Sequence, residues 1–446
     1  MSLPIVALLV YMATIIVWNF LLKRNIGEAM LVGLLVVTAF AGTDALAILP
    51  HAVGEAMQEQ VMFAGLAFVF MSYVLGRTPI LDNLIEILNS MLGRLKGGPV
   101  YTTTVAAGAF GSVAHVGAAV TAAVGSVTIP WMKRAQVKPE IAASVTAGCA
   151  GMGVTFPFSA TMFILVGGLA TTGTLTTDQL VVPLALGGLW CLGIRLVVNY
   201  HLVRKHGLAP MDAGDLLPFR SSFARGWTSL TLFVAMLVPV LMTMGWTGAR
   251  LNDHVDVDLG EAISLIVWIP VLMISIVLFL GRKHLPRSGS GWYELLAGAA
   301  PRFGVIGVTI VAAFAASNVL AEIGLPDALT SALGSFDAPR PIMAILVGLV
   351  VVAIAIPLTA SATMAAIGPV AVFTLMSVGV DPVTAAVAVL IFASTEGASP
   401  PAGAPIYVAA GLAQVDPAKM FRPLVTYFCL PIMGVGVLIA SGVLPV

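Results

Sequence analysis

The sequence predicts an all-α polytopic membrane protein with about ten spanning helices and two re-entrant hairpins. Its 446 residues are 59% hydrophobic and 9% charged, and the mean hydropathy is +1.03. Soluble domains carry about 25% charged residues, so this composition excludes an ordinary cytosolic enzyme. The net charge of zero gives no reason to expect a nucleic acid as a partner. The expected environment is the lipid bilayer.

The spans follow from the lengths of the apolar runs, because a helix needs about 20 residues to cross the bilayer core. Two long runs, Glu140–Ala170 and Pro382–Leu412, are broken by Gly and Pro. The blocks Pro99–Met132 and Pro341–Ser377 are each long enough for two short helices, and we interpret them as re-entrant hairpins. The eight uninterrupted spans are expected at Pro4–Leu22, Gly27–Ile48, Val61–Leu75, Leu180–Val203, Gly226–Trp246, Ala262–Leu280, Phe303–Ile323 and Pro423–Val443.

The basic residues predict the orientation, since cytoplasmic loops are enriched in Lys and Arg. With Lys23 and Arg24 in the cytoplasm, 18 of the 21 Lys and Arg fall on that side. Arg250 and Arg340 fall outside. Arg195 lies within a span, where we expect it to snorkel to the cytoplasmic face or form a structural pair rather than bind a solute. Treating the first hairpin as an ordinary span would reverse every later loop, so the bias supports re-entry and places both termini outside the cytoplasm.

An internal repeat relates the two broken runs. Pro139 pairs with Pro382 and Pro157 with Pro400, each 243 positions apart, and AAVGSVTIPWMKRAQVKPEIAASV aligns without a gap with AAIGPVAVFTLMSVGVDPVTAAVA. The orientation above gives the two copies opposite directions in the membrane. Inverted repeats of this kind build secondary transporters, whose binding site lies near the midplane where helices are discontinuous.

The repeat also predicts the domain organisation. A first inverted repeat is expected at 1–207 and a second at 226–446, joined by a cytoplasmic linker at 208–225. LDNLIEILNSMLGRL has helical apolar periodicity and predicts an interfacial arm helix, with WYELLAGAAPRFG as its counterpart in the second repeat. The expected internal elements are the arm helix at 80–96, the hairpin at 99–132 and the broken helix at 140–170, then the hairpin at 341–377 and the broken helix at 382–412.

The two hairpin tips and the two helix breaks are expected to converge on one site. A broken helix frees backbone groups, which are tolerated at membrane depth where they line a cavity or bind a ligand. Hydroxyl and carbonyl oxygens suit a hard cation such as Na⁺, and half-helix N-termini suit a carboxylate. The competing interpretation is that the breaks are simple kinks. The expected solute-binding or coupling residues are His115, Gly117, Thr155, Pro157, Ser159, Thr161, Thr359, Ser361, Thr363, Thr395, Glu396, Ser399 and Pro400, with Na⁺ expected at Gly117, Gly153, Ser361 and Ser399.

Glu396 is the one acidic residue deep in a predicted span. A carboxylate there costs several kcal/mol unless it is paired, hydrated or protonated, so a functional role is the first hypothesis and a structural hydrogen bond the alternative. His115 at the first tip is its expected partner because histidine titrates near physiological pH; the alternative is a capping or packing role. The repeat places Gly153 opposite Glu396, so the glutamate has no counterpart in the first copy.

Other chemistries have no support in the sequence. Cys149, Cys191 and Cys429 all lie in apolar runs and are interpreted as small core residues rather than as a disulfide framework. There is no HExxH motif, no P-loop lysine motif and no CxxC pair, so neither an intramembrane metalloprotease nor an ATP-driven pump is indicated. No catalytic residue and no cofactor is expected.

Three stretches carry a family resemblance: LDNLIEILNSMLGRLKGG, GSVTIPWMKRAQVKPEIAASVTAGCAGMG, and GVDPVTAAVAVLIFASTEGASPPAGAPIYVAAGLAQVDPAKMFRPLV. The chain resembles the large membrane subunit of tripartite ATP-independent periplasmic (TRAP) transporters, in the ion transporter superfamily. The most specific matches are Gly379–Pro382 before the second broken helix and Ser399–Gly403 at its break, where the family has Gly-Ile-Asp-Pro and Thr-Pro-Pro-x-Gly.

The resemblance implies an elevator mechanism and Na⁺-driven uptake of an organic acid across a bacterial inner membrane, with both termini periplasmic. It also implies a periplasmic solute-binding protein and a small four-helix membrane subunit as partners. The chain departs from the family pattern at the first tip, Ala114–Gly117, where the family has Ser-Gly-Ser-Ser. It departs again at Phe156–Ser159, where the family has Pro-Pro-Ser, and at Glu396, where the family has a small residue.

These departures leave several functions open. The first is an ion-coupled secondary transporter of a small polar organic solute, in the first instance an organic acid, with Na⁺ as the coupling ion. The second is a stand-alone proton-coupled carrier that uses Glu396 and His115, and a cationic or polar solute is also compatible with these residues. The alternative from another class is a channel or membrane receptor, but no continuous polar stripe of the kind expected for a channel is visible.

Overall fold

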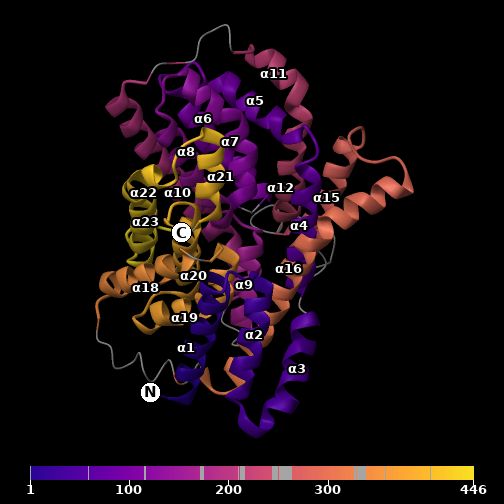
Figure 1. Cartoon of the computed structure of the whole chain (residues 1–446), viewed down its shortest axis with the longest axis vertical. Helices are drawn as coiled ribbons and strands as arrows, with labels where there is room; N and C mark the ends of the chain where they lie inside the picture. The colour runs from indigo at the N-terminus through magenta and orange to yellow at the C-terminus, as the bar shows by residue number, and fades with distance from the viewer. Residues whose placement is uncertain are drawn as a thin grey trace.

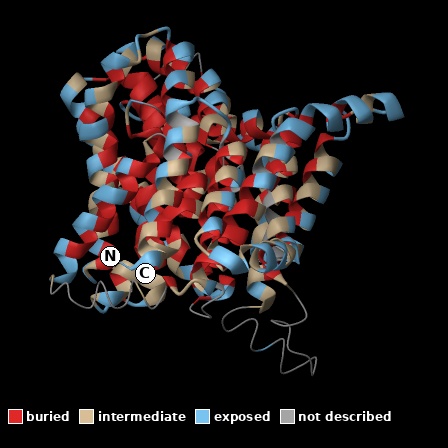
Figure 2. Cartoon of the chain, turned by 60° about the horizontal axis from the view of Figure 1, so that its bottom comes forward, coloured by how far each residue is buried: buried red, intermediate tan, exposed pale blue. Residues whose placement is uncertain are grey.

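The computed structural model describes the chain except residues 1, 59, 115–116, 171–174, 209, 211–215, 244–249, 251–263, 326–327, 329–337, 357 and 402. Every regular element in the described residues is a helix. This agrees with the predicted all-α class, since a helix satisfies its own backbone hydrogen bonds where lipid offers none. Figure 1 shows two groups of helices side by side, and Figure 2 shows buried residues concentrated through the middle of the molecule.

One group, which we call the α16 bundle, is built around the longest helix; most of it lies on the right in Figure 1, while α1 (Leu3–Ile16) lies at the lower left. Helix α16 contacts α2, α3 and α4, while α15 contacts α4 and α12. The members are α1 (Leu3–Ile16), α2 (Ile26–Ala39), α3 (Ala45–Gln58), α4 (Gln60–Leu75), α12 (Thr231–Thr243), α15 (Leu265–Gly281) and α16 (Gly289–Glu322).

The other group, which we call the hairpin bundle, contains both predicted hairpins and both predicted broken helices. Its first-half elements are α6 (Gly98–Ala114), α7 (Gly117–Arg134), α8 (Pro139–Cys149), η3 (Ala150–Thr155), α9 (Ala160–Ala170) and α10 (Thr177–His206). Its second-half elements are α18 (Arg340–Ala355), α19 (Ala360–Ser377), α20 (Pro382–Ala393), η6 (Ser394–Gly397), α21 (Ala404–Ala413), α22 (Ala418–Leu424), η7 (Val425–Cys429) and α23 (Leu430–Ala440).

The halves of this bundle have matching element boundaries. Helix α7 starts at Gly117 and α19 at Ala360, 243 positions later, and both helices are 18 residues long. Helices α8 and α20 begin at Pro139 and Pro382, again 243 positions apart. Figure 1 shows α6 and α7 toward the upper end and α18 and α19 toward the lower end. The second part of each broken helix crosses to the other hairpin: α21 packs on α7, and α9 packs on α19.

A short amphipathic arm lies at the top of Figure 1. Helix α5 (Ile80–Leu92) packs against α6 and against α11 (Phe219–Gly226), which η5 (Trp227–Leu230) follows. The predicted arm helix at 80–96 is present but ends at Leu92, and turns follow it. Its apolar stripe is buried, as the periodicity predicted, and Asp82 is exposed, but Asn89 and Ser90 are buried as well. Helix α11 occupies the end of the expected linker.

Two boundary predictions were wrong. The expected arm counterpart in the second half is continuous with the following span in the 34-residue helix α16. Pro301 lies inside that helix, and a single proline is tolerated in membrane helices. The expected span Gly27–Ile48 is divided, because α2 ends at Ala39 and Gly42 turns the chain with a φ of +62° before α3.

By length and composition, five helices among the described residues are apolar enough to cross a membrane, or six if the bent pair α8–α9 counts as one. The bend within that pair is 44°. These long candidates come from α10, α11–α12, α16, α19 and α22–α23. The shorter apolar helices include α1, α2, α15, α18 and α21, so the count of ten spans stays a prediction. Figure 2 shows both termini toward the lower edge of its view.

Candidate functional site

The two helix breaks touch each other at backbone distance. A Cβ added to Gly151 in η3 would overlap the carbonyl oxygen of Ser394 in η6, and one added to Gly397 would lie 2.5 Å from the carbonyl oxygen of Ala147. Gly151 and Ser394 are themselves 243 positions apart. Glycine is required here because two backbone segments approach each other without room for a side chain. The predicted convergence of the two breaks is therefore present.

The first break is stabilised by residues on both sides. Ser159 caps α9, since its hydroxyl accepts a hydrogen bond from the N–H of Met162 at 3.0 Å. Pro157 is buried beside it. Phe158 is 1% exposed and has a φ of +65°, a left-handed conformation that is rare for an aromatic residue. Such backbone strain gathers at functional sites, and nothing in the sequence had singled out Phe158.

Arg195 supports the same break from α10. Its side chain is 1% exposed, so snorkelling to the cytoplasmic face, one of the two expected roles, is excluded, and its contacts fit the structural alternative. Nε donates to the carbonyl of Gly148 at 3.2 Å, and Nη1 donates to the carbonyl of Cys191 at 3.2 Å. A cation at the C-terminal end of a half-helix is favourable because the last carbonyls lack intrahelical donors. Asn199, one turn along α10, donates to the hydroxyl of Thr104 in α6.

The second hairpin tip begins with a capped helix. The Thr359 hydroxyl accepts from the N–H of Ala362 at 3.3 Å, and the Thr363 hydroxyl donates to the Thr359 carbonyl at 3.0 Å. This tip is joined to the first break, because the hydroxyls of Thr161 and Ser361 lie 3.0 Å apart. The bond links residues 200 positions apart, so it ties the two halves of the chain together.

The remaining hydroxyls at the breaks point back into the chain. Thr155 donates to the carbonyl of Met152 at 2.9 Å, and Thr395 donates to the carbonyl of Phe392 at 2.8 Å. Such a hydroxyl keeps its lone pairs free for a cation. Ser399 lies 3.5 Å from the sulfur of Cys429, at the end of the π-helix η7. That irregular turn was not predicted, although such turns are frequent at functional sites.

Glu396 lies between the two hairpin tips. Its Oε2 accepts a hydrogen bond from the backbone N–H of Ala360, the first residue of α19, at 2.5 Å. A Cβ added to Gly117, the first residue of α7, would lie 2.5 Å from Oε1. Gly117 and Ala360 are repeat mates, 243 positions apart. The two oxygens of a single carboxylate therefore adjoin equivalent positions of the two hairpins.

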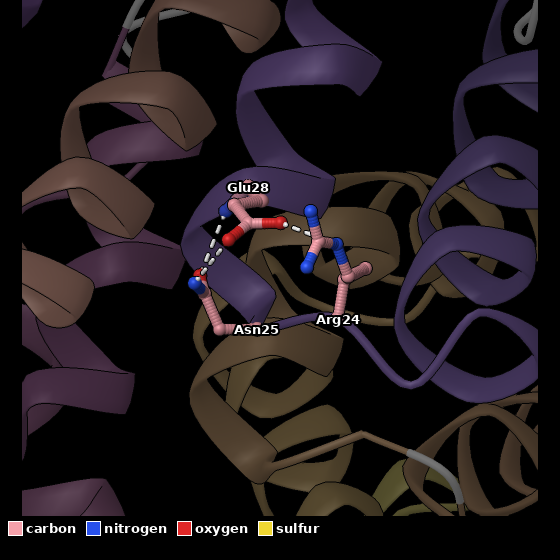
Figure 3. Close-up of polar contacts among 3 residues, drawn as sticks. All are labelled: Arg24, Asn25 and Glu28. Carbon is pink, nitrogen blue, oxygen red and sulfur yellow. Dashed lines mark hydrogen bonds and ion pairs between the residues drawn. The ribbon is translucent and has the colours of Figure 1, made fainter.

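The carboxylate of Glu396 has no basic side chain as an ion-pair partner among the described residues. Glu396 is 8% exposed. Glu28 gives the contrast shown in Figure 3. There a carboxylate at the N-terminus of α2 accepts from Asn25 Nδ2 at 2.8 Å and pairs with Arg24 Nε at 3.2 Å, all at the surface. Two positive helix ends stabilise Glu396 instead of a basic side chain.

The structure places the predicted site residues in different ways. Gly117, Thr161, Ser361 and Glu396 lie at contacts between the two halves, as described above. Pro400 is half-buried next to the break, and its peptide bond with Pro401 is cis. His115 lies outside the described residues. The Na⁺ set of Gly117, Gly153, Ser361 and Ser399 comes from four different segments of the chain, and it stays a prediction.

An apolar pocket separates the hairpin bundle from the α16 bundle. It is formed by α1 and α16 on one side and by α9 and α19 on the other, and encloses about 590 Å³ of space continuous with its opening. Tyr11, Phe314 and Phe373 are among its lining residues. One polar contact crosses near it, from the hydroxyl of Ser317 to the carbonyl of Gly168 at 3.0 Å. This pocket is lined mainly by apolar side chains, and beside it the ring of Phe314 packs directly onto Gly167.

The sequence is similar to those of several known proteins. It is 23% identical over 363 residues to the isethionate TRAP transporter permease protein DctMQ of Oleidesulfovibrio alaskensis, a match that covers 80% of this chain and 54% of that protein. The chain thus spans about half the length of that relative. It is 22% identical to the uncharacterized protein y4mL of Sinorhizobium fredii, over 95% of this chain and 96% of that one.

Two solved transporter structures have a similar fold. The YdaH transporter of Alcanivorax borkumensis superposes with a TM-score of 0.63 at 16% identity, covering 89% of this chain and 88% of that one. MtrF of Neisseria gonorrhoeae, described as illuminating a class of antimetabolite efflux pumps, gives 0.65 at 14% identity, covering 89% and 84%. The sequence matches the family described as tripartite ATP-independent periplasmic transporter, DctM component, over residues 5–444. The chain belongs to the DctM family of TRAP transporter membrane components.

Proposed function

We propose that this protein is an ion-coupled secondary transporter that imports a small polar organic solute, in the first instance an organic acid, by an elevator mechanism. The observation that carries the proposal is the position of Glu396 between the N-termini of α7 and α19, where both hairpins and both breaks converge. Inverted-repeat transporters place their sites where discontinuous helices meet. Membership of the DctM family supports a transport function.

The inverted repeat is supported by the matching boundaries of the two halves. Second hairpin helices of equal length, broken helices that begin at equivalent positions, and contact between the mates Gly151 and Ser394 are expected at a pseudo-two-fold axis. An axis of this kind lets one site face either side of the membrane when the halves exchange conformations. In this proposal the hairpin bundle moves and the α16 bundle is the scaffold.

The apolar pocket between the bundles supports relative motion of the two, and a cysteine pair tests it. A Cβ added to Gly168 would lie 3.8 Å from the Ser317 hydroxyl, so a mercury ion can bridge Gly168→Cys and Ser317→Cys. The background lacks Cys149, Cys191 and Cys429. Bridging should arrest transport, and a thiol reagent should restore it. The single variants are the controls, because an added Cβ at Gly168 also lies 2.7 Å from Pro369. Full transport by the bridged protein would exclude relative motion at this contact.

The coupling ion is the second element of the proposal. Na⁺ is the first candidate, supported by family resemblance and by hydroxyl and carbonyl oxygens at the breaks. A proton is the other candidate, favoured by a buried carboxylate that has no cationic partner among the described residues. Purified protein in liposomes, given an imposed Na⁺ or H⁺ gradient, should accumulate solute under one gradient and not the other. Uptake that only equilibrates the solute would identify a channel.

The resemblance also supports two protein partners in the bacterial inner membrane and periplasm. One is a periplasmic solute-binding protein, and the other is a small four-helix membrane subunit. The relative from Oleidesulfovibrio alaskensis is named as a DctMQ permease and is longer than this chain. Co-purification of the natively expressed protein tests both partners, and uptake by the single chain in liposomes would show that neither is required.

A further inference from the structure

The place between the two hairpin tips is already occupied by a negative charge of the protein itself. Two half-helix N-termini, which carry partial positive charge, are the arrangement that discontinuous transporters offer to an anionic substrate group. Here Oε2 of Glu396 takes the N–H of Ala360, and Oε1 lies against Gly117. A carboxylate of an incoming solute would find this place filled.

The same carboxylate also repels a second anion. Two carboxylates that share a buried site cannot both stay ionised without a large cost. Glu396 is 8% exposed, and no Lys or Arg of the described chain lies within ion-pair distance to offset a second negative charge. An unpaired charge placed against the wrong ligand is a common way to achieve specificity. The site therefore discriminates against an acid group at this point.

One oxygen of the Glu396 carboxylate has no hydrogen-bond donor among the described residues. Among the described residues, Oε2 has the N–H of Ala360 as its donor, and no donor reaches Oε1. Thr359, which precedes Ala360, is exposed, and Ser361 and Pro400 are half-buried. The tip next to Glu396 thus borders open surface with polar groups. Oε1 of Glu396 is not among the fully buried oxygens without a partner, so it is open to a ligand that approaches from this surface, and a carboxylate oxygen forms a strong hydrogen bond with a charged N–H group.

We propose that the transported solute carries a cationic nitrogen, an ammonium or guanidinium group, and that this nitrogen pairs with Glu396 between the hairpin tips. The inference rests on the proposed transport function and refines its substrate class from an organic acid to an amine or an amino acid-like zwitterion. In a zwitterion the acid group binds away from Glu396. Glu396 then determines specificity by contacting the solute directly.

The test uses pairs of compounds that differ only in an ammonium or a hydroxyl group. A library of small amines, guanidinium compounds, zwitterions and hydroxy acids is first screened for thermal stabilisation of the purified full-length protein. Each stabilising compound is then compared with its hydroxyl analogue, as 2-aminoethanesulfonate is compared with 2-hydroxyethanesulfonate. The ammonium member should bind about tenfold more tightly, the difference expected for one charge-assisted hydrogen bond.

The isosteric variant Glu396→Gln keeps an acceptor for Ala360 and removes the charge. In this variant the affinities for the ammonium and hydroxyl members should differ by no more than about twofold. The variant Glu396→Asp keeps the charge and should still bind the ammonium member more tightly. Glu28→Gln is the matched control, because that carboxylate is exposed at the start of another helix and paired with Arg24. This control should bind the ammonium member more tightly than the hydroxyl member by the same factor as the wild type.

Three results of the binding experiments would overturn the inference. They are a library in which no cationic compound stabilises the wild type, a wild-type preference for the hydroxyl member, or an unchanged ammonium preference in Glu396→Gln. The wild-type comparison stands even if the variant fails to fold. Failure of the transport function has a different signature, since no solute would then accumulate in liposomes under any ion gradient. A solute without a cationic nitrogen that does accumulate would refute this inference alone.

Discussion

The two helix breaks have the same order of elements and different chemistry. At each, a helix ends, a short 3-10 turn follows, and a second helix crosses to the opposite hairpin. The first break has Gly153 where the second has Glu396, and Lys138 stands where the second half has Asp381. The two breaks therefore differ in where they carry charge.

This difference separates what the fold requires from what the chemistry requires. The glycines that let η3 and η6 touch are needed on both sides, because backbone contact leaves no alternative. The carboxylate is needed once, because one group can adjoin both hairpin tips. A functional residue in a repeat protein is thus best sought where the repeat mates disagree.

The largest expected effect comes from breaking the contact between the two turns. Gly151→Ala places a methyl group against the Ser394 carbonyl, and neither backbone can yield. We expect about 3 kcal/mol of destabilisation or failure to fold, as for severe overpacking. The measurement is thermal unfolding in detergent. Gly193→Ala in α10 is the control, since nothing lies within 4 Å of its added Cβ. Equal stability of the two variants would show that the turns do not touch.

Gly117→Ala tests whether the carboxylate must reach both tips. The atom in its way is the end of the flexible Glu396 side chain, so the fold should survive while Oε1 is displaced. We expect about a tenfold fall in uptake, the size of one lost charge-assisted interaction, with little change in thermal stability. A matching loss of stability would instead assign Gly117 a packing role, and full uptake would remove the first tip from the site.

The bond between Thr161 and Ser361 measures how firmly the halves are joined. Thr161→Val and Ser361→Ala each remove one hydroxyl, and a double-mutant cycle should give a coupling of about 1 kcal/mol. Thr374→Val is the control, because that hydroxyl donates to its own helix at Val370. A coupling near zero would mean that the two hydroxyls do not interact.

The smallest expected effect concerns the starts of the broken helices. Asp381 caps α20 by accepting from the N–H groups of Val383 and Thr384, whereas Lys138 gives α8 no side-chain cap. Asp381→Ala should lower the free energy of unfolding by about 0.5 to 1 kcal/mol, and Lys138→Asp should raise it by a similar amount. Thermal unfolding measures both. Changes of the same sign would show that capping does not distinguish the two halves.

Much of the hairpin bundle could be predicted from sequence because proline and glycine mark where membrane helices break. The predicted start at Pro382 matches that of α20 to the residue, and the predicted start at Glu140 is one residue after that of α8. The α16 boundary could not be predicted, since Pro301 lies within a continuous helix and periodicity does not distinguish a long helix from two short ones.

The site was predictable in its residues and less so in its contacts. Glu396 could be singled out because a carboxylate in an apolar run is costly. Its neighbours Ala360 and Gly117 supply backbone groups, and backbone donors carry no signature in a side-chain pattern. Phe158 and the π-helix around Phe428 were missed for the same reason, because each is defined by backbone conformation.

The central claim is that Glu396 in the second break couples solute movement to an ion gradient. Its most direct test is uptake into liposomes by wild type and Glu396→Gln, using a solute that stabilises the purified protein and an imposed Na⁺ or H⁺ gradient. We predict that wild type accumulates solute against its concentration gradient. The variant should accumulate about tenfold less solute, and its thermal stability should be unchanged. Normal gradient-driven uptake by Glu396→Gln would contradict the claim.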